Sequence, residues 1–206
     1  MRFKSIIINF DNNKMSQIEL CGSKKTPSIQ KVMILLDELK LEYTVNDGDC
    51  KTPFDIDFYV KYNNRILYEP RSVMRYIATK NDKDVDLYTD VEVDDWLEME
   101  SRHFDPVAGA IVYEKLFKKW NNEKADNDIV VENLEKVEHI LDFYEKRLGE
   151  QQYIGGNVFS IADISHVPYI IYLVKSGYKE LFKKRPKVYE WVKRITKRES
   201  VKKMMN

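Results

Sequence analysis

The spacing of hydrophobic positions changes near residue 80. Before that point, apolar residues recur in short segments, some with the alternation of a strand and others with the spacing of a helix. These segments predict strands at 16–20 and 41–46, a helix at 27–40, a hairpin within 54–69 turning at Asn63-Asn64, and a helix containing Ser72 to Ala78. The order β-α-β followed by β-β-α predicts a small domain with a two-layer core.

After residue 90 the pattern is helical almost throughout. Apolar residues recur at intervals of three and four over 128–148, which is typical of an amphipathic helix. Pro106 should kink or divide the long helical stretch at 91–120. Further helices are predicted at 159–173 and 185–198.

The clearest local signal is "FSIADISHVPYIIYL", residues 159–173. Ser160 and Asp163 have the spacing of a capping box, in which each side chain satisfies the other residue's free backbone N–H. The helix that follows is apolar along most of its length, so we expect it at the centre of the helical half. This signal concerns folding rather than chemistry.

Composition adds limits to the possible functions. Lys plus Arg and Asp plus Glu each number 34, so no overall field favours nucleic acid or an acidic membrane as a partner. No apolar run approaches the roughly 20 residues that span a bilayer. Cys21 and Cys50 are too few for a disulfide framework and form no CxxC pair. We therefore expect a reducing cytoplasm, with Cys21 in the core.

Three histidines, His103, His139 and His166, are scattered over separate predicted helices, so no metal site is expected. The domain organisation that we predict is an N-terminal extension at 1–14, an α/β domain at 15–80, a linker at 81–90 and an all-helical domain at 91–206.

A family resemblance enters through several quoted segments. They are "LCGSKKTPS", "TPFDIDF", "EPRSV", "WLEMESRHFDP", "SIADISHVP" and "LFKKRPKVYEWVKRITKR". In this order they resemble the plant phi class of glutathione transferases, from Met15 to the C-terminus. The resemblance implies a truncated thioredoxin-like domain followed by the all-helical C-terminal domain of that family.

The same resemblance implies a set of site residues. It places Thr26 where the family has the hydroxyl that stabilises the glutathione thiolate, and Asp57, Glu69 and Arg71 around the tripeptide. It also places Phe104, Tyr113 and Phe117 in a hydrophobic substrate pocket. Two plainer interpretations stay open, because a threonine before a proline is also a good start for a helix. Aromatic residues at this helical spacing are also common in a core.

Several positions depart from the family pattern around glutathione. Phe58 replaces a cis-proline, and a cis bond before a non-proline residue costs about 3 kcal/mol. Pro70 replaces a serine and keeps the helix start while removing a hydroxyl and an N–H. Asp55 and Asp57 add negative charge near a ligand with two carboxylates. The segment before residue 52 is short enough to lack a family helix, which also calls the usual homodimer into question.

Three functions remain open from the sequence. The first is a protein with weak or lost glutathione conjugation that binds a small hydrophobic molecule between its domains. The second is an active transferase that uses Thr26 against hydrophobic electrophiles. The third is an assembly module, since a fold alone does not fix a function. The departures around glutathione favour the first.

Overall fold

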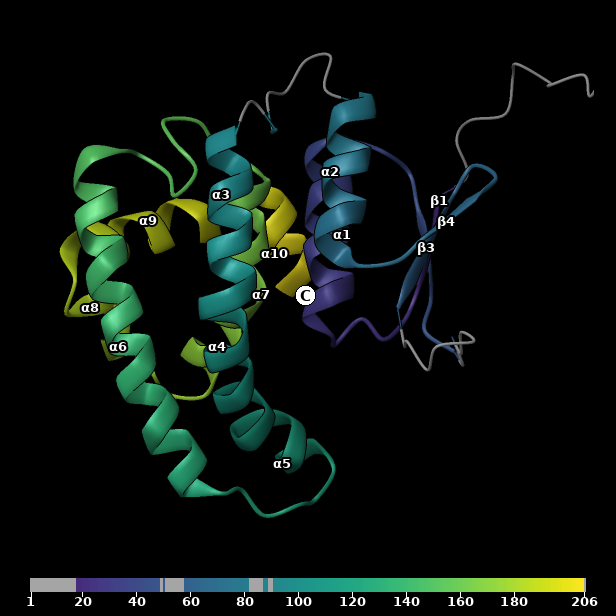
Figure 1. Cartoon of the computed structure of the whole chain (residues 1–206). Coiled ribbons are helices and arrows are strands. Elements are labelled where there is room, and N and C mark those ends of the chain that lie inside the picture. Colours follow the sequence, from purple (N-terminus) through teal and green to yellow (C-terminus); the bar gives the residue numbers. More distant parts are fainter. Residues whose placement is uncertain (1–17, 49, 51–57, 82–86, 89–90, 206) are drawn as a thin grey trace, which may run out of the picture.

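The computed structural model describes residues 18–48, 50, 58–81, 87–88 and 91–205 (Figure 1). Its N-terminal half confirms the predicted order of elements. They are β1 (Ile18–Cys21), α1 (Pro27–Glu38), β2 (Thr44–Asn46), β3 (Tyr59–Tyr62), β4 (Arg65–Leu67) and α2 (Pro70–Asn81). The hairpin turn lies at Asn63 and Asn64 as predicted, and Asn63 has the positive φ of 53° that such turns favour.

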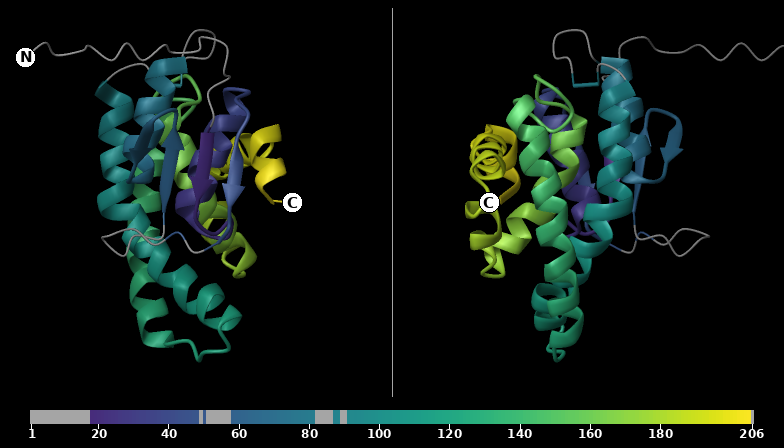
Figure 2. Two further views of the ribbon diagram at one scale, coloured as in Figure 1. Left: turned by 90° about the vertical axis from the view of Figure 1, so that its right-hand side faces the viewer. Right: turned by 60° about the vertical axis from the view of Figure 1, so that its left-hand side comes forward.

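The four strands form one mixed sheet in the order β2-β1-β3-β4. β1 is parallel to β2 and antiparallel to β3, which is antiparallel to β4. Figure 2 (left) shows this sheet facing the viewer with the helices behind it. α1 and α2 therefore lie between the sheet and the helical half, where their apolar faces are buried (Figure 1).

The helical half follows α2 in the chain. Its elements are α3 (Val91–Met99), a π-helical segment at Glu100–Phe104, α4 (Asp105–Val112), a second π-helical segment at Tyr113–Phe117, α5 (Lys118–Trp120), α6 (Asn127–Glu150), α7 (Ile161–Lys175), α8 (Lys179–Lys183), α9 (Pro186–Thr196) and α10 (Glu199–Met205). Pro106 lies in the first turn of α4, where its missing N–H is tolerated. The expected interruption takes the form of the π-helical turn just before it, a form often found at functional sites.

α7 forms the centre of the helical half, as its apolar sequence predicts. The capping box of Ser160 and Asp163 is present, and the Ser160 N–H donates to Asp163 Oδ2 at 2.9 Å. Asp163 also accepts hydrogen bonds from the Ile154 N–H at 3.0 Å and from the Trp191 indole at 2.7 Å. Burial raises the pKa of Asp163 to about 6, and these donors oppose the shift by stabilising the carboxylate.

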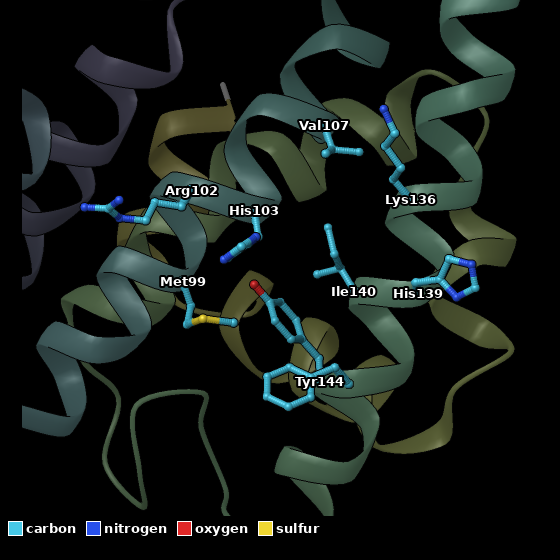
Figure 3. Close-up of a pocket in the computed structure, with 9 residues that line it drawn as sticks. Met99, Arg102, His103, Val107, Lys136, His139, Ile140 and Tyr144 are labelled. Atoms are coloured by element: carbon cyan, nitrogen blue, oxygen red, sulfur yellow. The ribbon is translucent and has the colours of Figure 1, made fainter.

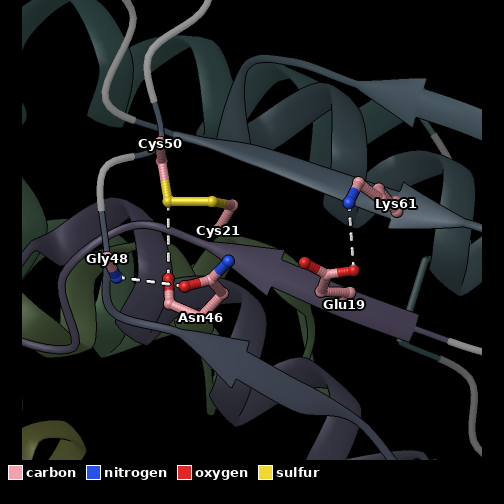
Figure 4. Close-up of a disulfide and its surroundings, with 6 residues drawn as sticks. All are labelled: Glu19, Cys21, Asn46, Gly48, Cys50 and Lys61. Carbon is pink, nitrogen blue, oxygen red and sulfur yellow. Dashed lines mark hydrogen bonds and ion pairs between the residues drawn. A yellow bond between two sulfur atoms is a disulfide. The ribbon is translucent and has the colours of Figure 1, made fainter.

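One expectation from the sequence is wrong. Cys21 and Cys50 form a disulfide with a Cα–Cα distance of 5.6 Å, whereas two cysteines without a CxxC pair were expected to stay reduced (Figure 4). The residues lie 29 positions apart in sequence, but the parallel pairing of β1 with β2 brings the chain after Asn46 back beside the end of β1. Spacing along the chain could not show this proximity.

The C-terminal helix returns to the first helix of the chain. The Arg198 guanidinium binds Glu38 of α1, with 2.8 Å between Nε and Oε1, and Lys203 of α10 binds Asp37 of α1. These contacts hold the end of the helical half against the α/β half. Within the described ranges, no helix is long and apolar enough to cross a membrane.

Several predictions fall on residues outside the described ranges. They are the extension at 1–14, Asp55, Asp57, the peptide bond before Phe58 and most of the segment between β2 and β3. The linker at 81–90 is described only in part. Its Leu87 is 1% exposed and accepts a hydrogen bond from the Ile161 N–H at 2.9 Å. At this point the linker is packed into the core beside the start of α7.

Candidate functional site

Thr26 lies at the end of the loop between β1 and α1, directly before Pro27. The loop begins at Gly22, whose φ of +141° suits a glycine and whose N–H donates to Asn46 O at 3.0 Å. Thr26 occupies the N-cap position, but within the described loop and helix its side chain accepts no capping hydrogen bond. Its hydroxyl instead donates to Ser23 O at 2.8 Å. The single hydroxyl proton is therefore used inside the loop.

Four aromatic rings lie beside this loop and form what we call the aromatic cluster. Its members are Tyr113, Phe117, Trp120 and Tyr172. Phe117 and Trp120 stack with their ring centroids 5.2 Å apart, and Tyr172 meets both rings edge-on at 6.0 Å. Tyr113 and Trp120 are 47% and 45% exposed, so the cluster presents aromatic surface to solvent.

Hydrogen bonds join the aromatic cluster to the β1–α1 loop. The Tyr172 hydroxyl donates to Lys25 O at 2.6 Å and accepts from Gln30 Nε2 at 2.6 Å. The Lys25 ammonium lies 5.5 Å from the Trp120 ring centroid, within reach of a cation–π interaction. The loop that holds Thr26 and the aromatic surface therefore form one connected region where the two halves meet.

Two of the three aromatic residues predicted for the pocket come together, and one does not. Tyr113 and Phe117 belong to the aromatic cluster, with ring centroids 6.4 Å apart. Phe104 is 0% exposed and packs against Tyr144 and His166 in the core of the helical half. Its position agrees with the plainer interpretation, in which an aromatic residue at helical spacing fills a core.

Glu69, Pro70 and Arg71 lie at the start of α2. Pro70 is the first residue of the helix, as predicted, and Glu69 O accepts the Val73 N–H at 3.0 Å. Glu69 is exposed and has a φ of +59°, a left-handed conformation that strains a residue with a side chain. The strained backbone directs the chain from β4 into α2.

Arg71 binds carboxylates of the helical half. Its Nε donates to Glu100 Oε2 at 2.7 Å, and its second nitrogen contacts Asp105. Lys31 of α1 completes the group, with its ammonium 3.0 Å from both Glu100 and Asp105. Burial alone would raise the pKa of Asp105, but the charges of Lys31 and Arg71 lower it. We call these residues, Lys31, Arg71, Glu100 and Asp105, the interdomain charge cluster.

His166 has a structural environment. Its Nδ1 lies 2.7 Å from Ala162 O and its Nε2 lies 2.9 Å from the Tyr144 hydroxyl, so a neutral ring can donate to the first and accept from the second. Burial lowers the pKa of His166 to about 4, although the Glu100 charge opposes the shift. Among the residues that the structure describes, no group of His, Cys, Asp and Glu is arranged to hold a metal ion.

A separate cavity of about 440 Å³ lies within the helical half (Figure 3). Met99, His103 and Val107 line it from one side and Ile140 and Tyr144 of α6 from the other. None of the residues predicted for the substrate pocket lines this cavity. It is therefore distinct from the aromatic cluster.

Sequence reasoning missed three residues of the region around Thr26. Trp120 lies three positions after Phe117, so the helical spacing that selected Tyr113 and Phe117 could have been extended to it. Tyr172 and Gln30 could not be found in this way, since their contacts join α7 to the β1–α1 loop across more than half of the chain.

Comparison with known proteins agrees with this architecture. Residues 104–199 match the family described as glutathione S-transferase, C-terminal domain. Glutathione S-transferase F13 of Arabidopsis thaliana is 31% identical over 193 residues, which cover 84% of this chain and 88% of that protein. A crystal structure of glutathione transferase F2 from Populus trichocarpa superposes with a TM-score of 0.86 at 30% identity, covering 91% of this chain and 97% of that one.

The fold and these relatives define the class of protein. The chain belongs to the glutathione S-transferase family, and its similarity is to the plant F, or phi, class. Glutathione S-transferase I from maize, solved in complex with an atrazine glutathione conjugate, is also similar. That structure has a TM-score of 0.84 at 25% identity, and the match covers 91% of this chain and 95% of that one.

Proposed function

We propose that this chain binds a small hydrophobic molecule at the aromatic cluster, between its two halves, and conjugates glutathione weakly or not at all. Small-molecule sites are mostly apolar and aromatic, with a few polar groups that fix orientation. The exposed rings of Tyr113 and Trp120 provide the first property. The Lys25 ammonium and the loop that ends at Thr26 provide the polar groups that would orient a ligand.

The single observation that supports the proposal of weak conjugation is the hydrogen bond from the Thr26 hydroxyl to Ser23 O at 2.8 Å. Glutathione reacts as a thiolate, which a hydroxyl stabilises by donating its proton to the sulfur. Thr26 can do this only after breaking its bond to Ser23. Because threonine is branched at Cβ, this rotation is also more restricted than it would be for serine.

The residues around the rest of the tripeptide support the same proposal. Pro70 offers neither a hydroxyl nor an N–H. Arg71 is engaged by Glu100 and Asp105, so its charge is already compensated within the protein. Glu69 remains exposed and is the residue of this group best placed to contact a ligand ammonium.

The second candidate function is an active glutathione transferase that uses Thr26. It is favoured by the position of Thr26 directly before α1, because the positive end of the helix dipole stabilises a thiolate. The solved relative with a bound glutathione conjugate supports the same candidate, since this chain shares its fold.

Two titrations separate the candidates. Calorimetry with glutathione should show little or no binding, and conjugation of 1-chloro-2,4-dinitrobenzene should be slow. Fluorescence titration with neutral N-phenyl-1-naphthylamine should show binding that Phe117→Ala weakens several-fold. Phe143→Ala is the matched control, because Phe143 is a half-exposed aromatic residue of the other cavity. Tight glutathione binding with rapid conjugation would support the second candidate, and loss of probe binding in Phe143→Ala alone would contradict the first.

A further inference from the structure

Another cavity lies on the side of α7 that faces away from the β1–α1 loop. It has a volume of about 370 Å³ and is bounded by α7, α8, α9 and α10. Its floor is apolar and includes Ile171, Val174, Phe182 and Val192. We call it the lysine groove, because Lys175, Lys179 and Lys193 are its charged lining residues. Figure 1 labels the four helices that contribute its lining residues.

The three lysines come from three different helices. Lys175 ends α7, Lys179 begins α8 and Lys193 lies in α9. Within the described part of the chain, no carboxylate lies at ion-pair distance from any of them, and the lining of the groove contains no acidic residue. Two of them lie over aromatic rings: Lys193 Nζ is 4.9 Å from the Tyr189 centroid, and Lys175 Nζ is 5.9 Å from the Tyr172 centroid.

The neighbouring acidic residues are already paired with other lysines. Glu180 binds Lys183 at 2.6 Å, Glu190 lies 3.9 Å from Lys187, and Glu199 binds Lys202 at 2.6 Å. The whole chain carries equal numbers of acidic and basic side chains. The chain as a whole is therefore neutral, but the lining of the lysine groove is locally positive around an apolar floor.

From this combination we infer that the lysine groove binds an amphipathic carboxylate, such as a medium-chain fatty acid. The apolar floor suits an aliphatic tail, because burying each methylene group is favourable. The carboxylate would lie at the rim, where it meets uncompensated ammonium groups at the edge of a low-dielectric surface. A cation would be repelled, and an inorganic anion would leave the apolar floor unused.

The lysine groove adjoins the aromatic cluster at one point, where Lys175 Nζ lies 5.9 Å from the Tyr172 ring centroid, but Tyr172 does not line the groove. Tyr172 faces the β1–α1 loop, whereas Ile170 and Val174 are two positions away on α7 and so lie about 200° around the helix. A ligand in the lysine groove therefore need not touch Phe117 or Trp120, and either site can be tested while the other is altered.

The test uses decanoate as the probe and decanol as its uncharged counterpart, with the full chain at low ionic strength. We expect decanoate to bind at least tenfold more tightly than decanol and to weaken as NaCl is added. Affinity should also rise from hexanoate to decanoate. Amide chemical-shift changes should centre on Val174, Lys193 and Thr196, which line the groove.

Paired variants isolate the contribution of the charges. The double variant Lys179→Gln with Lys193→Gln should bind decanoate at least fivefold more weakly. Lys183→Gln with Lys187→Gln removes the same charge from the same two helices outside the groove, and should change affinity less than twofold. Phe117→Ala should leave decanoate binding unchanged.

Several results would overturn the inference. They are no decanoate binding, equal binding of decanol, equal loss in both double variants, or shift changes centred on Tyr113 and Phe117. Sedimentation velocity tests whether a second copy of the chain, and not a carboxylate, occupies the groove. A dimer that the Lys179 and Lys193 substitutions dissociate would show that a second copy of the chain occupies it, and would also overturn the inference.

Discussion

The Lys31 ammonium lies 3.0 Å from Glu100 Oε1, although the two side chains are only 2% and 0% exposed. Lys31 belongs to α1 of the α/β half, and Glu100 begins the π-helical turn of the helical half. Arg71 and Asp105, which are 17% and 25% exposed, join the same group, so two positive and two negative charges lie together where the halves meet. The position of α1, and of the loop that holds Thr26, depends on this interdomain charge cluster.

Removing one charge from this cluster should destabilise the protein strongly. Lys31→Met leaves the Glu100 carboxylate buried with less compensation, and breaking a buried ion pair in this way costs about 3–5 kcal/mol. Urea unfolding at pH 7 measures the loss. Lys61→Met is the matched control, because its partner Glu19 lies on the sheet surface and the pair is solvated (Figure 4). Equal losses in the two variants would show that the buried cluster contributes no more than a surface pair.

His166 should make stability depend on pH between about 4 and 6.5. Its folded pKa is about 4 and its ordinary value is 6.5, so in this range the unfolded chain binds the proton and the folded chain does not. The stabilisation is complete above pH 6.5 and is lost as pH falls. It should decrease by about 2 kcal/mol between pH 7.5 and pH 5.

A variant separates this effect from that of Asp163, whose raised folded pKa of about 6 acts in the opposite direction over part of the same range. His166→Gln keeps a donor and an acceptor for Ala162 O and the Tyr144 hydroxyl but does not titrate. The difference in unfolding free energy between wild type and His166→Gln should therefore shrink or reverse at low pH. A difference that is constant from pH 7.5 to 5 would rule out this role of His166.

The disulfide gives a third prediction. It joins residues 29 positions apart and closes a loop that contains α1 and β2, and such a loop restricts the unfolded chain by about 3.5 kcal/mol in the chain-entropy model. Reduction with dithiothreitol should lower the unfolding free energy by up to that amount. The double variant Cys21→Ala with Cys50→Ala should be insensitive to reductant. If the oxidised wild type is also insensitive, the link does not contribute to stability.

Much of the fold could be predicted from local patterns. The hairpin at Asn63-Asn64, the helix start at Pro70 and the capping box of Ser160 depend on neighbours within a few residues, and all three are confirmed. Phe104 shows the limit of this reasoning, because its spacing is the same in a core as in a pocket. The structure places it in the core through contacts with Tyr144 and His166, far along the chain.

The remaining features join distant segments. The pairing of Cys21 with Cys50 depends on the parallel register of β1 and β2, which no residue spacing reveals. Lys31 and Glu100 are also far apart in the sequence, at a separation of 69 residues. Their pairing could not be predicted, because a charged residue on a predicted helix is ordinarily exposed to solvent. Tyr172 joins the region around Thr26 only because α7 packs beside the β1–α1 loop, where the Tyr172 hydroxyl donates to Lys25 O. The partner of each of these residues lies in a distant segment, so only the tertiary structure reveals it.

The last prediction concerns Thr26 and distinguishes its two possible roles. Its hydroxyl donates to Ser23 O and makes no cap to the described residues of α1, so Thr26→Ala should lower the unfolding free energy by only about 1 kcal/mol, the value of one neutral hydrogen bond.

Thr26→Ser removes the methyl group and frees the rotation about the Cα–Cβ bond, so its hydroxyl can turn toward a bound thiol more easily. We expect Thr26→Ser to conjugate 1-chloro-2,4-dinitrobenzene at least threefold faster than wild type, while Thr26→Ala stays at the slow wild-type rate. If Thr26→Ala instead abolishes a substantial wild-type rate, Thr26 already activates the thiol and the chain is an active transferase.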